Sequence, residues 1–186
     1  MAKDIVYFDL ETQRSFKAVG GAKNKSQMGI SVGVAFSTAQ QKYLIYDDSN
    51  ASDLGELLLK ADLVVGYNHI DFDYPVLQGY VLNEMAPQTV NLDMMVYLEE
   101  KIGYRPKLDL VAEATLGAKK SADGIEALKW WQEHKKTGSF DPVMKIAEYC
   151  CFDVKVTMRV HEFGVENGYV CYFDKSGELC KVEVSW

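Results

Sequence analysis

The segment Asp4–Leu10 constrains the fold more than any other part of the chain. Its sequence, DIVYFDL, is rich in aromatic and β-branched residues and therefore predicts a β-strand. Side chains of a strand alternate between its two faces, so Phe8 and Leu10 are expected on one face. Asp9 and Glu11 are then expected together on the other. This pattern indicates a central strand of a layered sheet that presents two carboxylates at its carboxyl end.

The rest of the chain predicts an antiparallel meander followed by strand–helix–strand crossovers. A loop rich in Gly, Lys, Asn and Ser, at about residues 13–28, leads into the next strands. The further strands are expected at Ile30–Ser37, Lys42–Tyr46, Leu63–Tyr67 and Val90–Asp93, with a closing hairpin at Tyr169–Val184. The helices are expected at Ser52–Ala61, Tyr74–Asn83, Met95–Ile102, Leu108–Leu116, Gly124–Lys135 and Asp141–Phe163. Ser52 or Asp53 is the expected cap of the first helix.

These elements predict an α/β fold with a mixed five-stranded sheet in the order 3-2-1-4-5 and helices on both faces. Right-handed crossovers place the later strands beside the first one. We expect one domain over residues 1–168 and a C-terminal hairpin, residues 169–186, packed on it. In such sheets the functional site lies at the carboxyl ends of the central strands. That position corresponds to Asp9–Glu11 and Gly66–Asp73.

Composition narrows the function classes. The 186 residues carry a net charge of -7, which argues against a tight, sequence-specific nucleic-acid binder, because such proteins are usually basic. Part of this excess has another explanation if several acids form a metal site. The chain has no apolar run long enough to cross a membrane and no signal-peptide pattern at its start, so we expect a cytoplasmic protein.

The four cysteines are expected to be reduced in that compartment. Cys171 and Cys180 flank the turn of the predicted hairpin. They face each other if its loop has two residues, and a bulged loop shifts this register by one.

Three segments carry acids in positions that suit chemistry. Asp9 and Glu11 share one strand face, and two carboxylates so placed favour Mg²⁺ or Mn²⁺ between them. Asp73 follows the fourth strand, where it either joins this cluster or only caps the next helix. Tyr149 and Asp153 are four residues apart on a helix and so share a face. The plain alternative for that pair is an aromatic core stripe with an acid at its solvated edge.

Taken together, the motifs FDLET, N-x-x-x-F-D-x-P-x-L and Y-C-x-x-D resemble the three exonuclease motifs of the DEDDy nucleases. The second and third are especially similar to the proofreading domain of family B DNA polymerases, and the resemblance spans about residues 4–160. It implies a ribonuclease-H-like fold with four metal-binding carboxylates and a catalytic tyrosine on the residues Asp9, Glu11, Asp73, Asp153 and Tyr149.

The resemblance also implies individual roles. Asp9 bridges two divalent ions, Glu11 and Asp153 complete one ion site, and Asp73 supports the other. Tyr149 orients the attacking water. The expected substrate contacts are Leu10, Thr12, Asn68 and Phe72.

The sequence therefore predicts a stand-alone, metal-dependent 3′–5′ exonuclease that acts on single-stranded DNA or RNA. A separate helicase or polymerase is an expected partner. Two alternatives stay open: a catalytically silent nucleic-acid-binding module, and a phosphoesterase of short oligonucleotides. The basic loop Lys17–Gln27 is either a contact for the nucleic-acid backbone or a plain solvated loop. Trp130 and Trp131 either stack on bases or belong to the core.

Overall fold

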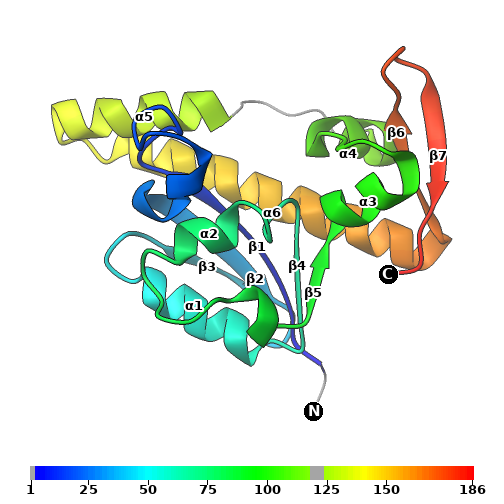
Figure 1. Ribbon diagram of the computed structural model, residues 1–186, viewed down its shortest axis with the longest axis horizontal. Helices are drawn as coiled ribbons and strands as arrows, with labels where there is room; N and C mark the ends of the chain where they lie inside the picture. Colours follow the sequence, from blue (N-terminus) through cyan, green and yellow to red (C-terminus); the bar gives the residue numbers. More distant parts are fainter. Residues whose placement is uncertain (1–2, 118–123) are drawn as a thin grey trace.

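The computed structural model describes residues 3–117 and 124–186 and contains a mixed five-stranded sheet. Its strand order is β3-β2-β1-β4-β5, as the sequence predicted (Figure 1). The strands are β1 (Ile5–Thr12), β2 (Ile30–Ser37), β3 (Lys42–Tyr46), β4 (Leu63–Gly66) and β5 (Asn91–Asp93). The antiparallel meander β1–β2–β3 and the parallel pairs β1–β4 and β4–β5 place β1 at the centre. The predicted fold class is confirmed.

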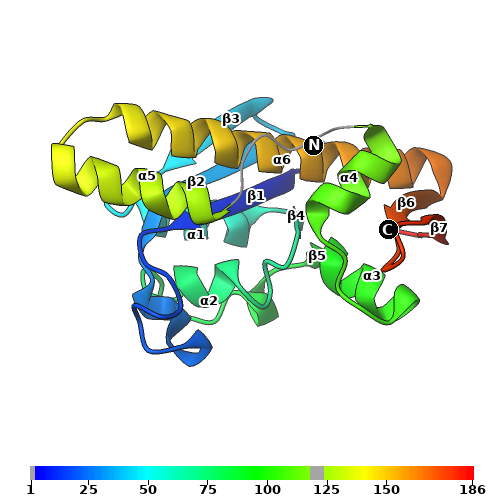
Figure 2. The same cartoon turned by 90° about the horizontal axis from the view of Figure 1, so that it is seen from above.

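Helices cover both faces of this sheet (Figure 2). The helices are α1 (Ala51–Lys60), α2 (Asp73–Leu77), α3 (Met94–Ile102), α4 (Leu108–Leu116), α5 (Gly124–Thr137) and α6 (Asp141–Asn167), with the short 3₁₀ segments η1 (Ala22–Gln27) and η2 (Ala86–Gln88). Along β1, Phe8 and Leu10 enter the core cluster beneath α1 and α2, whereas Tyr7 enters the cluster beneath α6. The alternation of β1 therefore turns Asp9 and Glu11 toward α6.

The two largest differences from the predicted helix boundaries have tertiary causes. The helix expected at Tyr74–Asn83 ends at Leu77, and the next residues form tight turns. A Cβ on Gly79 would lie 2.4 Å from the backbone oxygen of Ser26, so the chain turns there to pack against η1. Conversely, α6 continues past Phe163 to Asn167, because the indole of Trp186 packs against Gly164 inside the helix.

The predicted cap of α1, Ser52 or Asp53, was wrong by two or three residues. The helix begins at Ala51, its N-cap is Asn50, and no side chain caps it. The Asn50 side chain instead accepts a hydrogen bond from the Asp47 N–H at 2.7 Å, which closes the preceding turn. The Asn50 side chain therefore bonds the preceding turn and is not available to cap the helix.

A hairpin of β6 (Tyr169–Phe173) and β7 (Leu179–Glu183) follows α6. Val170 and Val182 bury their side chains in the same core cluster as α6. In the hairpin register Cys180 lies opposite Tyr172, whereas Cys171 lies opposite Lys181. The two cysteines therefore point to opposite faces, and the longer loop produced the one-residue shift. No helix in the described part of the chain is long and apolar enough to cross a membrane.

Candidate active site

Three carboxylates meet where the carboxyl end of β1 passes beneath α6. Asp9 and Glu11 project from β1 toward this helix, and Asp153 projects from α6 toward the strand. One ligand oxygen from each of the three lies within 4.8 Å of the others. Like charges at this separation repel strongly in a partly buried site unless a cation balances them. The donor set consists of carboxylate oxygens, which fits a hard divalent ion such as Mg²⁺ or Mn²⁺.

Tyr149 lies one helical turn before Asp153 and is almost fully buried. Burial raises the pKa of its phenol far above the ordinary value, and the nearby Asp153, Glu11 and Asp9 raise it further. The phenol therefore keeps its proton at neutral pH and donates a hydrogen bond to Asp153. In this state Tyr149 can orient a water or a substrate oxygen, but it does not serve as a base.

Asp73 lies beside the three carboxylates as the first residue of α2. It does not cap this helix, because Phe72 is the N-cap and makes no side-chain cap bond. The Asp73 Oδ1 instead accepts a hydrogen bond from the Leu10 N–H at 3.2 Å, which ties α2 to β1. Burial raises the pKa of Asp73, and the nearby Asp9 and Asp93 add to this rise. A bound cation at this position would favour its charged form.

A cavity of about 410 Å³ opens beside these acids, and we call it the active-site pocket. Its walls include Asp9, Glu11 and Asp73 and all four predicted substrate contacts, Leu10, Thr12, Asn68 and Phe72. Phe16, from the loop after β1, also lines it and meets the ring of Phe72 edge-on at 5.7 Å between centroids. Phe16 was not among the residues predicted for the site. Tertiary packing of the loop against α2 was needed to identify it.

Asn68 is held in an uncommon conformation in the turn after β4. Its φ of 69° lies in the left-handed region, which Asn tolerates better than most residues. Arg105 donates to the Asn68 Oδ1 at 3.3 Å and pairs with Asp71 at 2.6 Å and Glu99 at 2.7 Å. Arg105 therefore ties the Asn68 turn to Asp71 and Glu99.

Asp93 holds the same turn through hydrogen bonds to its backbone. The sequence predicted this residue only as part of a strand. It is nearly inaccessible, and its Oδ1 accepts from the N–H of Asn68 at 2.8 Å. Its Oδ2 accepts from the Ile70 N–H at 3.0 Å, and the same carboxylate caps α3 through Met95 and Val96. One buried acid thus fixes both the turn that carries Asn68 and the start of α3.

His69, in the turn after β4, is not part of the carboxylate cluster. It is fully buried, and burial lowers its pKa, so the ring is neutral. Its Nε2 contacts Asn91 Oδ1 at 3.2 Å, and its ring meets Phe8 edge-on. A Cβ on Gly66 would lie 2.7 Å from its Nδ1, so the end of β4 depends on this close contact. His69 has a packing role here.

Cys150 is a further residue that was not predicted to belong to the site. Its thiol donates to the backbone oxygen and to Oδ2 of Asp9, each at 3.3 Å. Burial raises the pKa of this thiol, so it stays a neutral donor. Its position beside Tyr149 in the Y-C-x-x-D segment was the available signal, but only the crossing of α6 over β1 brings it to Asp9.

The two neighbouring tryptophans of α5 pack within the protein. The ring of Trp130 meets Tyr149 edge-on, with 6.4 Å between centroids, and Trp131 contacts His134. Both are partly buried against the core cluster beneath α6. Trp130 therefore helps to hold the catalytic tyrosine candidate in place, which favours the core alternative over base stacking.

Comparison with known proteins identifies the class that this fold and site define. The chain belongs to the RNase H superfamily, whose family model matches residues 6–163. The family B DNA polymerase from the hyperthermophilic archaeon Pyrobaculum calidifontis has a similar fold, with a TM-score of 0.62 at 17% identity. That match covers 89% of this chain and 25% of the polymerase, so the chain spans a quarter of the polymerase's length. A search of curated proteins found no match.

The likeness to family B DNA polymerases expected from the motifs is thereby confirmed at the level of fold. The superfamily and the carboxylate cluster together support a nuclease that uses divalent metal.

Proposed function

We propose that this chain is a 3′–5′ exonuclease of the DEDDy type that removes nucleotides from single-stranded DNA or RNA with two divalent ions. The observation that carries the proposal is the convergence of Asp9, Glu11 and Asp153 within 4.8 Å at the end of the central strand. The contact of Asp73 with the Leu10 N–H and that of Tyr149 with Asp153 also support it, because the DEDDy motifs imply a fourth carboxylate and a tyrosine. The adjoining cavity has room for about one nucleotide and ends at the acids.

In this proposal Asp9, Glu11 and Asp153 would hold one ion, and Asp73 would help to hold a second. Divalent ions bound there would lower the pKa of a water and stabilise the charged oxygens of the phosphodiester. The acids supply the ligands, and the Cys150 thiol and the Leu10 N–H fix the orientation of Asp9 and Asp73. This fixed orientation is the protein's own contribution to metal-assisted hydrolysis.

The protein residues around the reacting bond have distinct tasks. Tyr149 keeps its proton and orients the attacking water beside Asp153. Phe72 and Phe16 present an apolar wall to the terminal base, while Asn68 and Thr12 contact the sugar and phosphate. A wall of this kind makes no distinction between bases, which suits stepwise removal of nucleotides.

A time course on 5′-labelled single-stranded DNA and the matching RNA, with Mg²⁺ or Mn²⁺, tests the proposal. The expected result is a descending ladder of labelled products that disappears with EDTA and with Asp9→Asn. Asp53→Asn, an equal change on the exposed surface of α1, is the matched control and should leave the ladder intact.

Other outcomes would redirect the assignment. Immediate release of a labelled mononucleotide would indicate the opposite direction, and cleavage of a circular single strand would indicate an endonuclease. Binding without cleavage by metal-loaded protein would favour the catalytically silent module. Cleavage confined to dinucleotides would favour the phosphoesterase of short oligonucleotides.

A further inference from the structure

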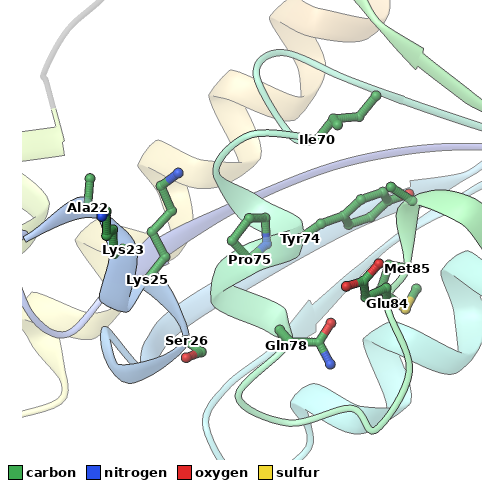
Figure 3. A pocket seen from close by; sticks show the side chains of 11 residues that line it. Ala22, Lys23, Lys25, Ser26, Ile70, Tyr74, Pro75, Gln78, Glu84 and Met85 are labelled. Atoms are coloured by element: carbon green, nitrogen blue, oxygen red, sulfur yellow. The ribbon is translucent and has the colours of Figure 1, made fainter.

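A second cavity, of about 440 Å³, lies between η1 and the segment that follows β4 (Figure 3). Lys23 and Lys25 of η1 line one side, Pro75 of α2 lies next to them, and Glu84 and Met85 lie farther across. We call it the lysine pocket. The segment 68–75 separates it from the active-site pocket, since Asn68, Phe72 and Asp73 line that cavity. The two cavities thus share one wall.

The loop between β1 and β2 is the other structure that the two cavities share. Phe16 and Met28 of this loop line the active-site pocket, and Lys23 and Lys25 line the lysine pocket. Residues 13–28 contain four Lys and Arg residues and no acid, although the whole chain has a net charge of -7. Positive charge is therefore concentrated on the loop that leads from the acids to the lysine pocket.

The lysine pocket is held in shape by several contacts of this loop. Lys25 Nζ donates to the backbone oxygen of Asp71 at 2.6 Å, and the Asn24 side chain donates to Val19 O at 2.7 Å. Ser26 packs directly on the backbone at Gly79, where a Cβ would not fit. An ammonium group has three donors, so Lys25 keeps two for a ligand after bonding Asp71.

The chemistry of the walls is mixed in a way that suits a nucleotide. The partly exposed side chains of Ile70 and Pro75 offer apolar atoms to a base. Lys23 and Lys25 offer cations to a phosphate. Glu84 also lines the cavity and opposes an anion there.

We propose that the lysine pocket is a second nucleic-acid subsite, which holds a nucleotide upstream of the 3′ end that lies in the active-site pocket. That the bound molecule is a single-stranded nucleic acid follows from the proposed function. It implies that the enzyme binds a single strand at two places, the reacting end through the carboxylate site and an upstream phosphate through Lys23 and Lys25. Longer strands should then be held more tightly than short ones.

Binding of a 5′-fluorescent oligothymidylate in EDTA tests the subsite without any cleavage. In fluorescence anisotropy, Lys23→Ser with Lys25→Ser should weaken binding and lower the slope of log affinity against log salt by about 1.4, for two lost phosphate contacts. Lys42→Ser with Lys60→Ser removes two exposed lysines outside both cavities and should leave the slope unchanged. Glu84→Gln should strengthen binding, because it removes the opposing charge.

Cleavage kinetics with Mn²⁺ separate this inference from the proposed function. The single variant Lys23→Ser, which keeps the contact of Lys25 with Asp71, should retain the wild-type kcat/KM on a dinucleotide and lose part of the increase in kcat/KM with strand length. Cleavage with unchanged salt slope and length dependence would overturn the subsite and leave the exonuclease intact. Weakened binding in the double variant of a protein that cleaves nothing would support the subsite and remove the exonuclease.

Discussion

Asp93→Asn tests the role of the buried carboxylate that holds the Asn68 turn. In the wild type, Oδ1 serves three N–H donors and Oδ2 accepts from Ile70 N–H at 3.0 Å. An Asn side chain retains one acceptor oxygen and presents an NH₂ group to the other side. It therefore loses one hydrogen bond to a charged group, worth about 1.5–3 kcal/mol, and leaves a buried donor without an acceptor. We expect the free energy of unfolding to fall by about 2–3 kcal/mol.

The change is measured by urea denaturation at neutral pH, with Asp53→Asn as the matched control. Asp53 also lies in the first turn of a helix, but it is exposed, so its loss should cost less than about 0.5 kcal/mol. Because the clamped turn carries Asn68 and leads to Asp73, cleavage should also slow in Asp93→Asn under conditions where the variant is fully folded. Equal urea midpoints for Asp93→Asn and the control would show that the hydrogen bonds of Asp93 to this turn do not stabilise the fold.

Three further predictions address other parts of the structure. Burial lowers the pKa of His161 to about 4 from 6.5, so between these values the unfolded chain takes up a proton that the folded chain excludes. Stability should therefore fall by about 2 kcal/mol as pH falls from 6.5 to 4, and His161→Asn should flatten this dependence in pH-dependent denaturation. Gly79→Ala should lower the unfolding free energy by about 1–3 kcal/mol in urea, because its Cβ would meet Ser26 O at 2.4 Å; unchanged stability would contradict this packing. Tyr149→Phe should reduce kcat by about 100-fold or more while the rise in Tm with Mn²⁺ stays at the wild-type size, and loss of that rise would instead indicate a ligand role.

The sequence by itself determined the layered fold and the position of the central acids. Successive side chains of a strand point to opposite faces, so Asp9 and Glu11 must point away from the face that holds Phe8. A shift of one residue would move every side chain to the wrong face, so burial of the apolar side chains fixes this arrangement. The i, i+4 spacing of Tyr149 and Asp153 likewise placed both on one helix face. The face that a side chain occupies on a strand or helix depends on local backbone geometry, so it can be predicted from the spacing of residues within one segment.

Tertiary structure decided the features that depend on contacts between distant segments. The pairing of Asp93 with Asn68 joins two strand ends, and the thiol of Cys150 reaches Asp9 only because α6 crosses β1. The early end of α2 depends on backbone contact between Gly79 and Ser26, which overrides the local helical pattern. The lysine pocket likewise exists because the loop after β1 docks on α2. Steric fit and burial between remote segments set these features, and no spacing within a single segment encodes them.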